Sequence, residues 1–468
     1  MKRILYISFF TVICSTLFLS CSESFLDQER QLVSTEPLVF TNAAKCEAAV
    51  LGLYSGFKGG NFMGGRNYIA FDARGEDIEN IDRNGVTLYN TYIMQVNSSH
   101  EENSTAWAAA YSTINRANVF IESIAEYKTA DVIGVEKANQ YVAEAKFLRG
   151  LTYYYLANMY SEPYKLNKNA KAFPLRLTAI KESGHSDCAS STISKVYEAI
   201  LNDVSDAQIA ALPATATIKT RATKAAAYML RMRVYMAMEN WSAAIAAGEA
   251  VSGYTLVDNV AAQFVSPFYT AESIFSCPMS TNDQSGTQRS CWEYYYNGRL
   301  LVVDKANGIM SKPNYSLPTD KRIIAFDQTQ NGNPIVGKWY DASNGRLKWV
   351  PIMRFAETKL NLAECYAQSN NPTAARKALS DVRRRAITAQ NDPLNIDELS
   401  GAALLEAISF ERRLEFLGEG MRGIDILRKG ETFKPGTSYA TAPGSPYYVW
   451  PFPETEKVVN KLWNDLEK

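Results

Sequence analysis

The chain has 468 residues, which is enough for one large domain or two ordinary ones. Hydrophobic residues make up 46% of it and charged residues 21%, as in an ordinary globular protein. The formal net charge is zero, so no basic surface for nucleic acid is indicated. There are two histidines, His100 and His185, which argues against His-based metal centres and against Ser–His–Asp or Cys–His catalysis.

The N-terminus has the pattern of a secretory signal. Basic residues precede an apolar run over residues 4–19, which is short for a membrane span of about 20 residues. Ser20 and Cys21 end that run, and a small residue before a cysteine resembles the bacterial lipobox. We therefore expect a signal peptide over residues 1–20 and acylation of Cys21, which would anchor the chain in lipid. A plain signal peptide that is cut elsewhere is the alternative.

Apolar side chains with helical spacing follow. They recur every three or four residues within residues 104–121, 141–159 and 193–204. Pro163 closes the second stretch, and Thr192 supplies a helix start before the third. The spacing predicts one amphipathic helix in each stretch.

An internal repeat lies further along the chain. Tyr235 and Tyr366 are each followed by an alanine nine positions later and by a valine sixteen positions later, with asparagine between. This resembles the tetratricopeptide pattern, in which two helices are joined by a tight turn. We expect helical repeats over residues 104–251 and 351–430.

Two longer stretches lack helical periodicity. Gly, Asn, Ser, Thr and Pro punctuate short aromatic runs over residues 58–97 and 252–350, so we expect loops and a few short strands there. Long irregular stretches inside a compact domain are commonly functional. The predicted fold class is mainly all-α, a tetratricopeptide-like helical-repeat scaffold with loop-rich insertions. Residues 21–468 would form a single domain.

Five segments, taken together and in this order, resemble the SusD/RagB family. They are AEAKFLR with YYY (143–155), RATKAAA leading to Tyr235 (221–235), PIMRFAE with AE (351–364), ERR with EGMR and DILR (411–428), and WPFP with later Glu and Asn (450–460). The pattern departs from the family at Gly423, where an aromatic residue is usual. The chain is also short for the family, which suggests trimmed binding loops.

The resemblance implies a lipoprotein on the outer face of a Bacteroidetes-type outer membrane. It would bind glycan oligomers and deliver them to a SusC-like TonB-dependent transporter, over which it sits as a lid. It would also imply four tetratricopeptide-like units and no catalytic activity. A peptide ligand, as for RagB, and a helical-repeat scaffold that binds no small ligand are the alternatives.

Aromatic residues in the irregular regions are the candidate ligand contacts. Sugars present apolar C–H faces that stack on flat rings, while their hydroxyls need hydrogen-bonding partners, and Trp and Tyr supply both. A loop packed on the scaffold is the alternative, since alternate residues of a strand would be buried. The candidates are Trp292, Tyr294 and Tyr296 in the middle region and Tyr68, Asp72, Tyr89 and Asn90 near the N-terminus.

The C-terminal charged block could suggest a hydrolase. Glu411, Glu415, Glu419 and Asp425 offer paired carboxylates, as glycoside hydrolysis requires. Arginines are interleaved with them, however, and would hold these carboxylates ionised, whereas an acid catalyst needs a raised pKa. We therefore expect these carboxylates to form ion pairs with the arginines, and we expect that the protein is not an enzyme.

No metal or cofactor is expected either. Asp327 begins a run that resembles a calcium loop, but Lys338 stands where the bidentate glutamate belongs. The cysteines beyond Cys21 match no zinc spacing and are odd in number, so buried thiols are favoured, with a Cys277–Cys291 bridge left open. These cysteines are Cys46, Cys188, Cys277, Cys291 and Cys365.

Overall fold

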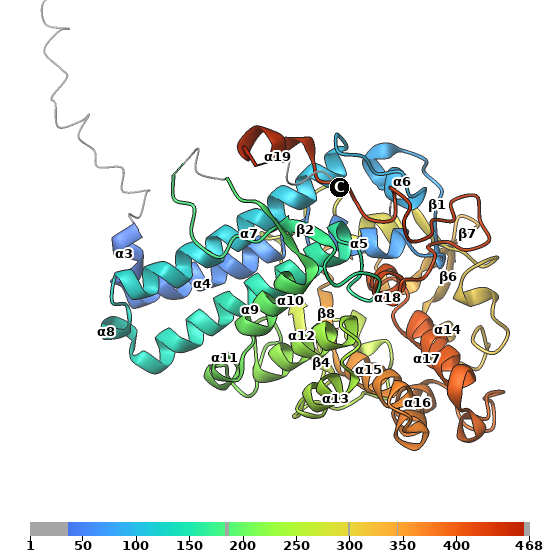
Figure 1. The fold of residues 1–468 in the computed structure, drawn as a ribbon. Helices are drawn as coiled ribbons and strands as arrows, with labels where there is room; N and C mark the ends of the chain where they lie inside the picture. Colours follow the sequence, from blue (N-terminus) through green and yellow to red (C-terminus); the bar gives the residue numbers. More distant parts are fainter. Residues whose placement is uncertain (1–35, 183–186, 298–299, 344, 463–468) are drawn as a thin grey trace, which may run out of the picture.

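The computed structural model describes residues 36–182, 187–297, 300–343 and 345–462. Helices make up most of these ranges, and the strands are few and short, so the predicted fold class is confirmed (Figure 1). None of the helices in the described ranges is both long enough and apolar enough to cross a membrane. The predicted signal peptide and Cys21 lie outside the described residues.

The helices of the first half are coloured blue to green in Figure 1. They are α3 (Glu36–Phe40), α4 (Ala43–Phe57), α5 (Arg66–Ala73), α6 (Tyr89–Tyr92), α7 (Glu101–Glu126), α8 (Ala130–Ile133), α9 (Val135–Tyr160), α10 (Ile193–Asp203) and α11 (Asp206–Ala211). Helices α4, α7 and α9 pack against one another, and α10 packs on α9. The Thr192 side chain caps α10 by accepting a hydrogen bond from the Lys195 amide.

The later helices complete the helical part of the molecule. They are α12 (Lys224–Ala237), α13 (Trp241–Glu249), α14 (Lys321–Phe326), α15 (Phe355–Gln368), α16 (Pro372–Ala386), α17 (Gly401–Glu415), α18 (Arg422–Lys429) and α19 (Glu454–Val459). Both predicted helical hairpins are present, as α12–α13 and α15–α16. Asn240 and Asn371 are the N-caps of the second helices, and their side chains accept from the amides three residues on.

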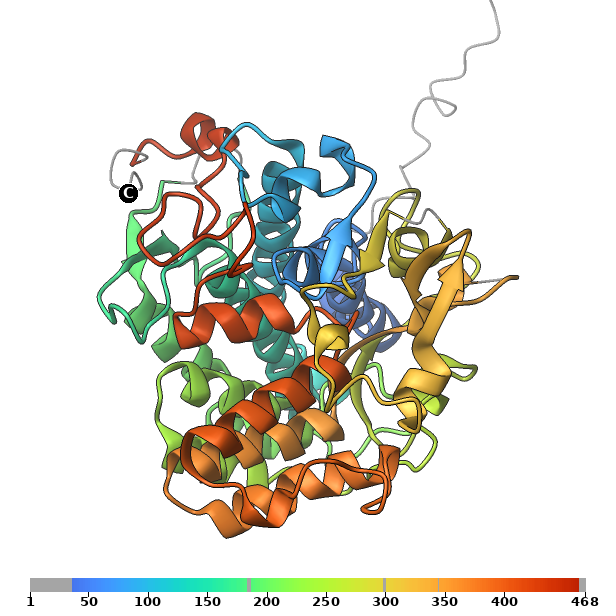
Figure 2. The same cartoon turned by 90° about the vertical axis from the view of Figure 1, so that its right-hand side faces the viewer.

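In the part of the chain that the structure describes, the strands pair as four antiparallel ladders of two strands each. They are β1 (Ile78–Asn80) with β5 (Leu301–Val303), β2 (Lys171–Pro174) with β3 (Ser190–Thr192), β4 (Ser273–Cys277) with β8 (Val350–Arg354), and β6 (Asp327–Gln330) with β7 (Asn333–Val336). The β1–β5 ladder joins the two irregular regions of the sequence, with Ile78 opposite Val303 (Figure 2). The Asp327 carboxylate, at the start of the calcium-like run, accepts a hydrogen bond of 2.9 Å from Lys305.

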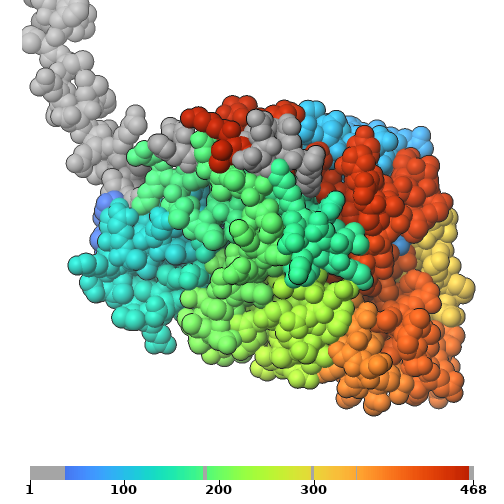
Figure 3. Space-filling view, viewed as in Figure 1, coloured from blue at the N-terminus to red at the C-terminus, as the bar shows by residue number. Residues whose placement is uncertain are grey.

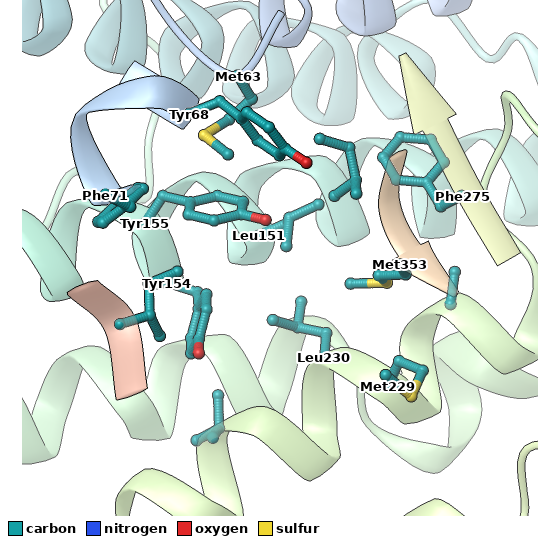
Figure 4. Packing of buried hydrophobic residues seen from close by; sticks show 14 of the residues in the cluster. Met63, Tyr68, Phe71, Leu151, Tyr154, Tyr155, Met229, Leu230, Phe275 and Met353 are labelled. Atoms are coloured by element: carbon teal, nitrogen blue, oxygen red, sulfur yellow. The ribbon is translucent and has the colours of Figure 1, made fainter. Parts of the chain in front are cut away.

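The hydrophobic core lies where the irregular regions meet the helical repeats (Figure 4). Tyr68 and Phe71 of α5 pack there with Tyr155 of α9, Phe275 of β4 and Met353 of β8. All five side chains are buried. Because large side chains from distant segments share this core, the loop regions are fixed parts of the domain.

The cysteines of the described residues are all free thiols. Cys277 and Cys291 are not bridged, and both are buried. Burial raises the pKa of Cys277 to about 12, so its thiol stays protonated. The favoured reading of these two cysteines as buried thiols is therefore confirmed.

A buried ion-pair network occupies the predicted charged block. Arg354, at the end of β8, bonds Glu415 and Glu272 through Nη1 at 2.6 and 2.7 Å and Glu419 through Nε at 2.8 Å. Burial alone would raise the pKa of Glu415, yet the guanidiniums of Arg385 and Arg354 hold it well below its ordinary value. Glu415 is therefore ionised, and all three carboxylates are paired with Arg354, as predicted from the sequence.

Other arginines of the block tie the C-terminal helices to the N-terminal half. Arg413 of α17 bonds Asp77, and Arg422 of α18 bonds Glu76 with a shortest distance of 2.7 Å. Asp425, a residue of the same block, accepts from Arg412 at 2.9 Å. Arg413 and Arg422 therefore connect helices α17 and α18 to the segment of Glu76 and Asp77.

Gly423 has a structural reason for being small. A Cβ atom there would lie 2.3 Å from the carbonyl oxygen of Phe71, because α18 packs directly on α5. We expect Gly423→Ala to lower the free energy of unfolding by about 1–3 kcal/mol, since the helices would have to separate. Urea denaturation measures this change.

Gly52 provides the matched control. It also lies in a helix, α4, but a Cβ atom there would meet nothing within 4 Å. Gly52→Ala should leave stability unchanged or raise it by up to about 1 kcal/mol, because alanine favours a helix. Equal effects of the two substitutions would contradict the close α5–α18 contact as the cause.

Candidate ligand-binding site

The two irregular regions are held together by close backbone packing. A Cβ atom on Gly60 would lie 1.8 Å from the carbonyl oxygen of Ser285, and one on Gly65 would lie 1.9 Å from that of Arg289. Only glycine permits such an approach. Residues 60–65 therefore lie directly against residues 285–289, and these two segments form what we call the glycine seam.

The buried side chain of Arg66 stabilises the glycine seam through hydrogen bonds. Its buried guanidinium donates to the carbonyl oxygens of Gln288 at 3.2 Å and Val86 at 3.1 Å and to the Glu101 carboxylate at 3.1 Å. One side chain thereby links the middle loop, the segment before α6 and the start of α7. The aromatic candidates of both regions are carried by these segments.

The aromatic run of the middle region folds into a π-helical turn, η3 (Glu293–Asn297). Such turns are rare and frequently lie at functional sites. Trp292, just before the turn, is half-buried and donates its indole N–H to the carbonyl oxygen of Asp341 at 2.9 Å. Its ring centroid lies 6.1 Å from that of Tyr296. The turn thus brings two of the three predicted residues together.

Tyr340 extends this pair into a cluster that the sequence analysis did not include. Its ring packs edge-on against Tyr296 with centroids 5.0 Å apart, and 49% of the residue is exposed. The Arg346 guanidinium lies 5.8 Å from the Trp292 ring centroid and bonds Glu293 at 2.6 Å. We call Trp292, Tyr296 and Tyr340 the loop cluster.

Four predicted residues are enclosed in the interior, and one of them is Tyr296 of the loop cluster, which is 8% exposed. Tyr294 is 0% exposed, and Tyr68 and Asp72 are also buried. Asp72 accepts hydrogen bonds from the Tyr295 hydroxyl at 2.8 Å and from the Gly420 amide at 2.9 Å. Burial raises the pKa of Asp72 to about 7. These side chains support the loops, so we place the ligand-facing part of the site on the other three predicted residues, Trp292, Tyr89 and Asn90.

The remaining predicted residues lie in α6. Tyr89 and Asn90 are both half-exposed, and the Tyr89 ring lies 6.3 Å from that of Tyr92. Tyr92 in turn packs on Tyr439, a C-terminal residue, at 5.4 Å. The Lys434 ammonium lies over the Tyr92 ring at 4.0 Å. A second group of rings therefore lies at α6, and Tyr439 is the member that the sequence did not indicate.

The chemistry of these groups suits a ligand with apolar faces and hydroxyls. Half-exposed rings offer stacking surfaces, and the phenol, amide and guanidinium groups beside them offer hydrogen bonds. Within the described residues, no three metal-type side chains gather in a manner that could hold an ion. The molecule is therefore a scaffold of helical repeats that carries aromatic loops, a protein of the helical-repeat class.

Comparison with known proteins identifies the family. Residues 25–236 match a family model described as starch-binding and associating with the outer membrane, and residues 327–460 match the SusD family model. A SusD superfamily protein from Bacteroides fragilis is 46% identical, with a TM-score of 0.87, covering 92% of this chain and all of the other. The chain belongs to the SusD/RagB family.

More distant relatives match nearly the whole length of the chain. A SusD-like protein of Formosa agariphila is 23% identical over 88% of this chain and 87% of its own. A SusD-like carbohydrate binding protein from Bacteroides vulgatus is 21% identical with a TM-score of 0.74, covering 91% of this chain and 98% of its own. The predicted family resemblance is confirmed.

Proposed function

We propose that this protein captures glycan oligomers at the loop cluster and delivers them to a SusC-like TonB-dependent transporter of the outer membrane. The loop cluster carries the proposal, because the half-buried Trp292 ring and the exposed Tyr340 ring lie beside polar groups, with the buried Tyr296 ring packed against both. The starch-binding description of the matched family and the carbohydrate-binding relative favour a glycan over a peptide. Release to a transporter requires reversible binding, so we expect micromolar affinity, about −8 kcal/mol.

We further propose that the protein catalyses no reaction. Glu411, Glu415, Glu419 and Asp425 all form buried ion pairs with arginine or lysine. A glycosidase needs one carboxylic acid that is protonated near neutral pH. The lowered pKa values of Glu415 and Asp425, caused by neighbouring guanidiniums against the effect of burial, oppose that role.

Anchoring by acylated Cys21 on the outer face of the outer membrane is the third part of the proposal. Acyl chains on this residue would place the domain beside its transporter without a membrane-spanning helix. Cys21→Ser should release the protein from membranes into the soluble fraction. Fractionation followed by mass spectrometry of the N-terminal peptide tests this, and a variant that stays membrane-bound would contradict lipid anchoring at Cys21.

The loop cluster makes a direct prediction for binding. We expect Trp292→Ala and Tyr340→Ala each to weaken glycan binding by about 10-fold or more, because each removes a ring on which a sugar can stack. Isothermal titration of the domain from Ser22 onward, against soluble polysaccharides and peptides, measures this. Tyr228→Ala is the control, since Tyr228 is a half-buried tyrosine of α12 with Arg231 5.7 Å over its ring.

The outcomes separate the alternatives. Glycan binding that is lost in the loop variants and kept in the control supports capture at the loop cluster. Peptide binding without glycan binding would move the ligand class to peptides. Binding to neither would favour a helical-repeat scaffold and overturn the proposal.

A further inference from the structure

A separate cleft of about 660 Å³ lies on the helical-repeat side of the molecule. Its walls come from the α12–α13 turn, α15, α17 and α18, and the segment around Lys165 borders it. Figure 3 shows these green, yellow-green, orange and red segments meeting on one face. The volume is within the range of about 300–1,000 Å³ typical of small-molecule sites. No residue of the loop cluster lines it.

One wall of the cleft offers a flat ring. Trp241, the first residue of α13, is half-buried, and its side chain packs against the core from the rim. Phe410 of α17 and Met236 of α12 add further apolar surface. Gln368 and Glu406, both exposed, supply polar groups at the mouth. A stacking surface with nearby donors and acceptors is the arrangement that a sugar ring requires.

The charges of the arginines on the floor of the cleft are balanced by ion pairs with carboxylates. Arg428 forms a two-point pair with Glu364 at 2.7 and 2.6 Å. Arg413 pairs with Asp77, and Arg422 pairs with Glu76. Burial would raise the pKa of Glu364, but Arg428 lowers it to about 2, so both partners are charged at neutral pH.

The rim is balanced in the same way. Lys165 pairs with Glu239 at 2.9 Å, and Lys429 lies 4.0 Å from Glu364. A strongly anionic or cationic ligand would gain little from such a surface and would meet like charges. A neutral ligand with many hydroxyls can donate to the carboxylates and accept from the cations at once. The balanced charges of the cleft therefore favour a neutral, hydroxyl-rich ligand over a charged one.

One floor donor still lacks a hydrogen bond. Among the described residues, Arg422 Nη1 has no acceptor within hydrogen-bonding geometry. Its nearest charged partner is Glu431 Oε2 at 3.5 Å, on a side chain that is 42% exposed. Small movements of Glu431 would let this guanidinium serve a hydroxyl that enters the cleft.

We propose that this cleft is a second binding site, which takes a neutral oligosaccharide with one sugar ring stacked on Trp241. Gln368 and Glu406 would bond its hydroxyls from the mouth. The existence of the site rests on the cleft itself, whereas its sugar ligand rests on the proposed function. Two sites would let the protein hold a long glycan at the repeats while the loops present another part of it.

Fluorine NMR of protein labelled with fluorotryptophan can report both sites separately. The chain has seven tryptophans, and Trp241→Phe and Trp292→Phe assign the two informative signals. The probes are maltoheptaose, xylohexaose and mannohexaose, with oligogalacturonate as the charged counterpart. We expect at least one neutral oligomer to shift the Trp241 signal, and oligogalacturonate to require about 10-fold or more higher concentration.

A second variant, with substitutions at the rim of the cleft, tests the site without altering a tryptophan that could be needed for folding. Gln368→Ala combined with Glu406→Ala changes only exposed side chains, and should weaken the response of Trp241 about fivefold while leaving that of Trp292 unchanged. An unchanged response of Trp241 in this variant would overturn the assignment of these two residues.

The possible patterns distinguish the second site from the proposed function. A shift of the Trp241 signal without a shift of the Trp292 signal would support the second site and contradict ligand binding at the loop cluster. Movement of Trp292 alone would overturn the second site and keep the proposed function. Silence of both signals across the neutral probes would overturn both, and movement of Trp241 with oligogalacturonate alone would overturn the neutral ligand class.

Discussion

Arg354→Ala is expected to lower the free energy of unfolding by about 3–5 kcal/mol. Arg354 is buried and bonds Glu272, Glu415 and Glu419 at 2.6 to 2.8 Å. Removing it would leave three buried carboxylates with fewer compensating charges. Their repulsion, together with lost hydrogen bonds, makes the penalty much larger than the net value of one ion pair.

Urea denaturation, monitored by circular dichroism, measures the change, and Lys377→Ala is the control. Lys377 pairs with Asp381 at 3.2 Å within α16, but its side chain is 77% exposed. Its removal should change stability by less than about 0.5 kcal/mol, because exposed pairs contribute little. A loss below about 1 kcal/mol for Arg354→Ala would mean that Arg385, Arg322 and Lys338 compensate the network without it.

Glu102→Gln is expected to stabilise the protein at neutral and higher pH by up to about 3 kcal/mol. Burial raises the pKa of Glu102 from 4.5 to about 7, while Thr91, Arg66 and Asn90 lower it in part and Glu101 opposes them. The folded state therefore holds a proton that the unfolded state has released. Glutamine keeps the shape of the protonated acid and removes the ionisation.

The sign of the pH dependence follows from proton binding. Between pH 4.5 and about 7 the folded state binds more protons at Glu102 than the unfolded state does, so this residue makes stability fall as pH rises. Above about pH 7 both states are ionised and its contribution stays constant. The variant should therefore match the parent at pH 4.5 and exceed it most near pH 8.

Stability curves of parent and variant over this pH range, from urea denaturation, test the prediction. Glu136→Gln is the control, because Glu136 also lies in the first turn of a long helix, α9, but is exposed. It should change stability by less than about 0.5 kcal/mol at any pH. Parallel curves for parent and Glu102→Gln would contradict the raised pKa.

The helical scaffold was predictable because its signals are local. Apolar spacing located α7, α9 and α10, and the Tyr–Asn–Ala repeat located α12–α13 and α15–α16. The ion pairs of the C-terminal charged block were also predictable, because arginines interleaved with carboxylates at close spacing favour ion pairs in any compact arrangement. These inferences needed no knowledge of distant contacts.

The site was only partly predictable because its contacts are distant in sequence. Tyr340 joins Tyr296 from 44 positions away, and Tyr439 reaches Tyr92 from the other end of the chain. The π-helical turn also distributes neighbouring aromatic residues in different directions, so Tyr294 is enclosed while Trp292 stays at the surface. Paired glycines at 59–60 and 64–65 were the one local signal of the glycine seam.

The glycine seam has a consequence for exchanging ligand preference between relatives. Residues 60–65 and 285–289 touch backbone to backbone, so a substitution or insertion in one segment displaces the other. Transplanting a single loop from a relative would introduce side chains at the contact and distort both halves. Residues 60–65 and 285–289 therefore have to be exchanged as one unit. A chimera that changes the bound ligand needs both segments, together with Arg66, from the same relative.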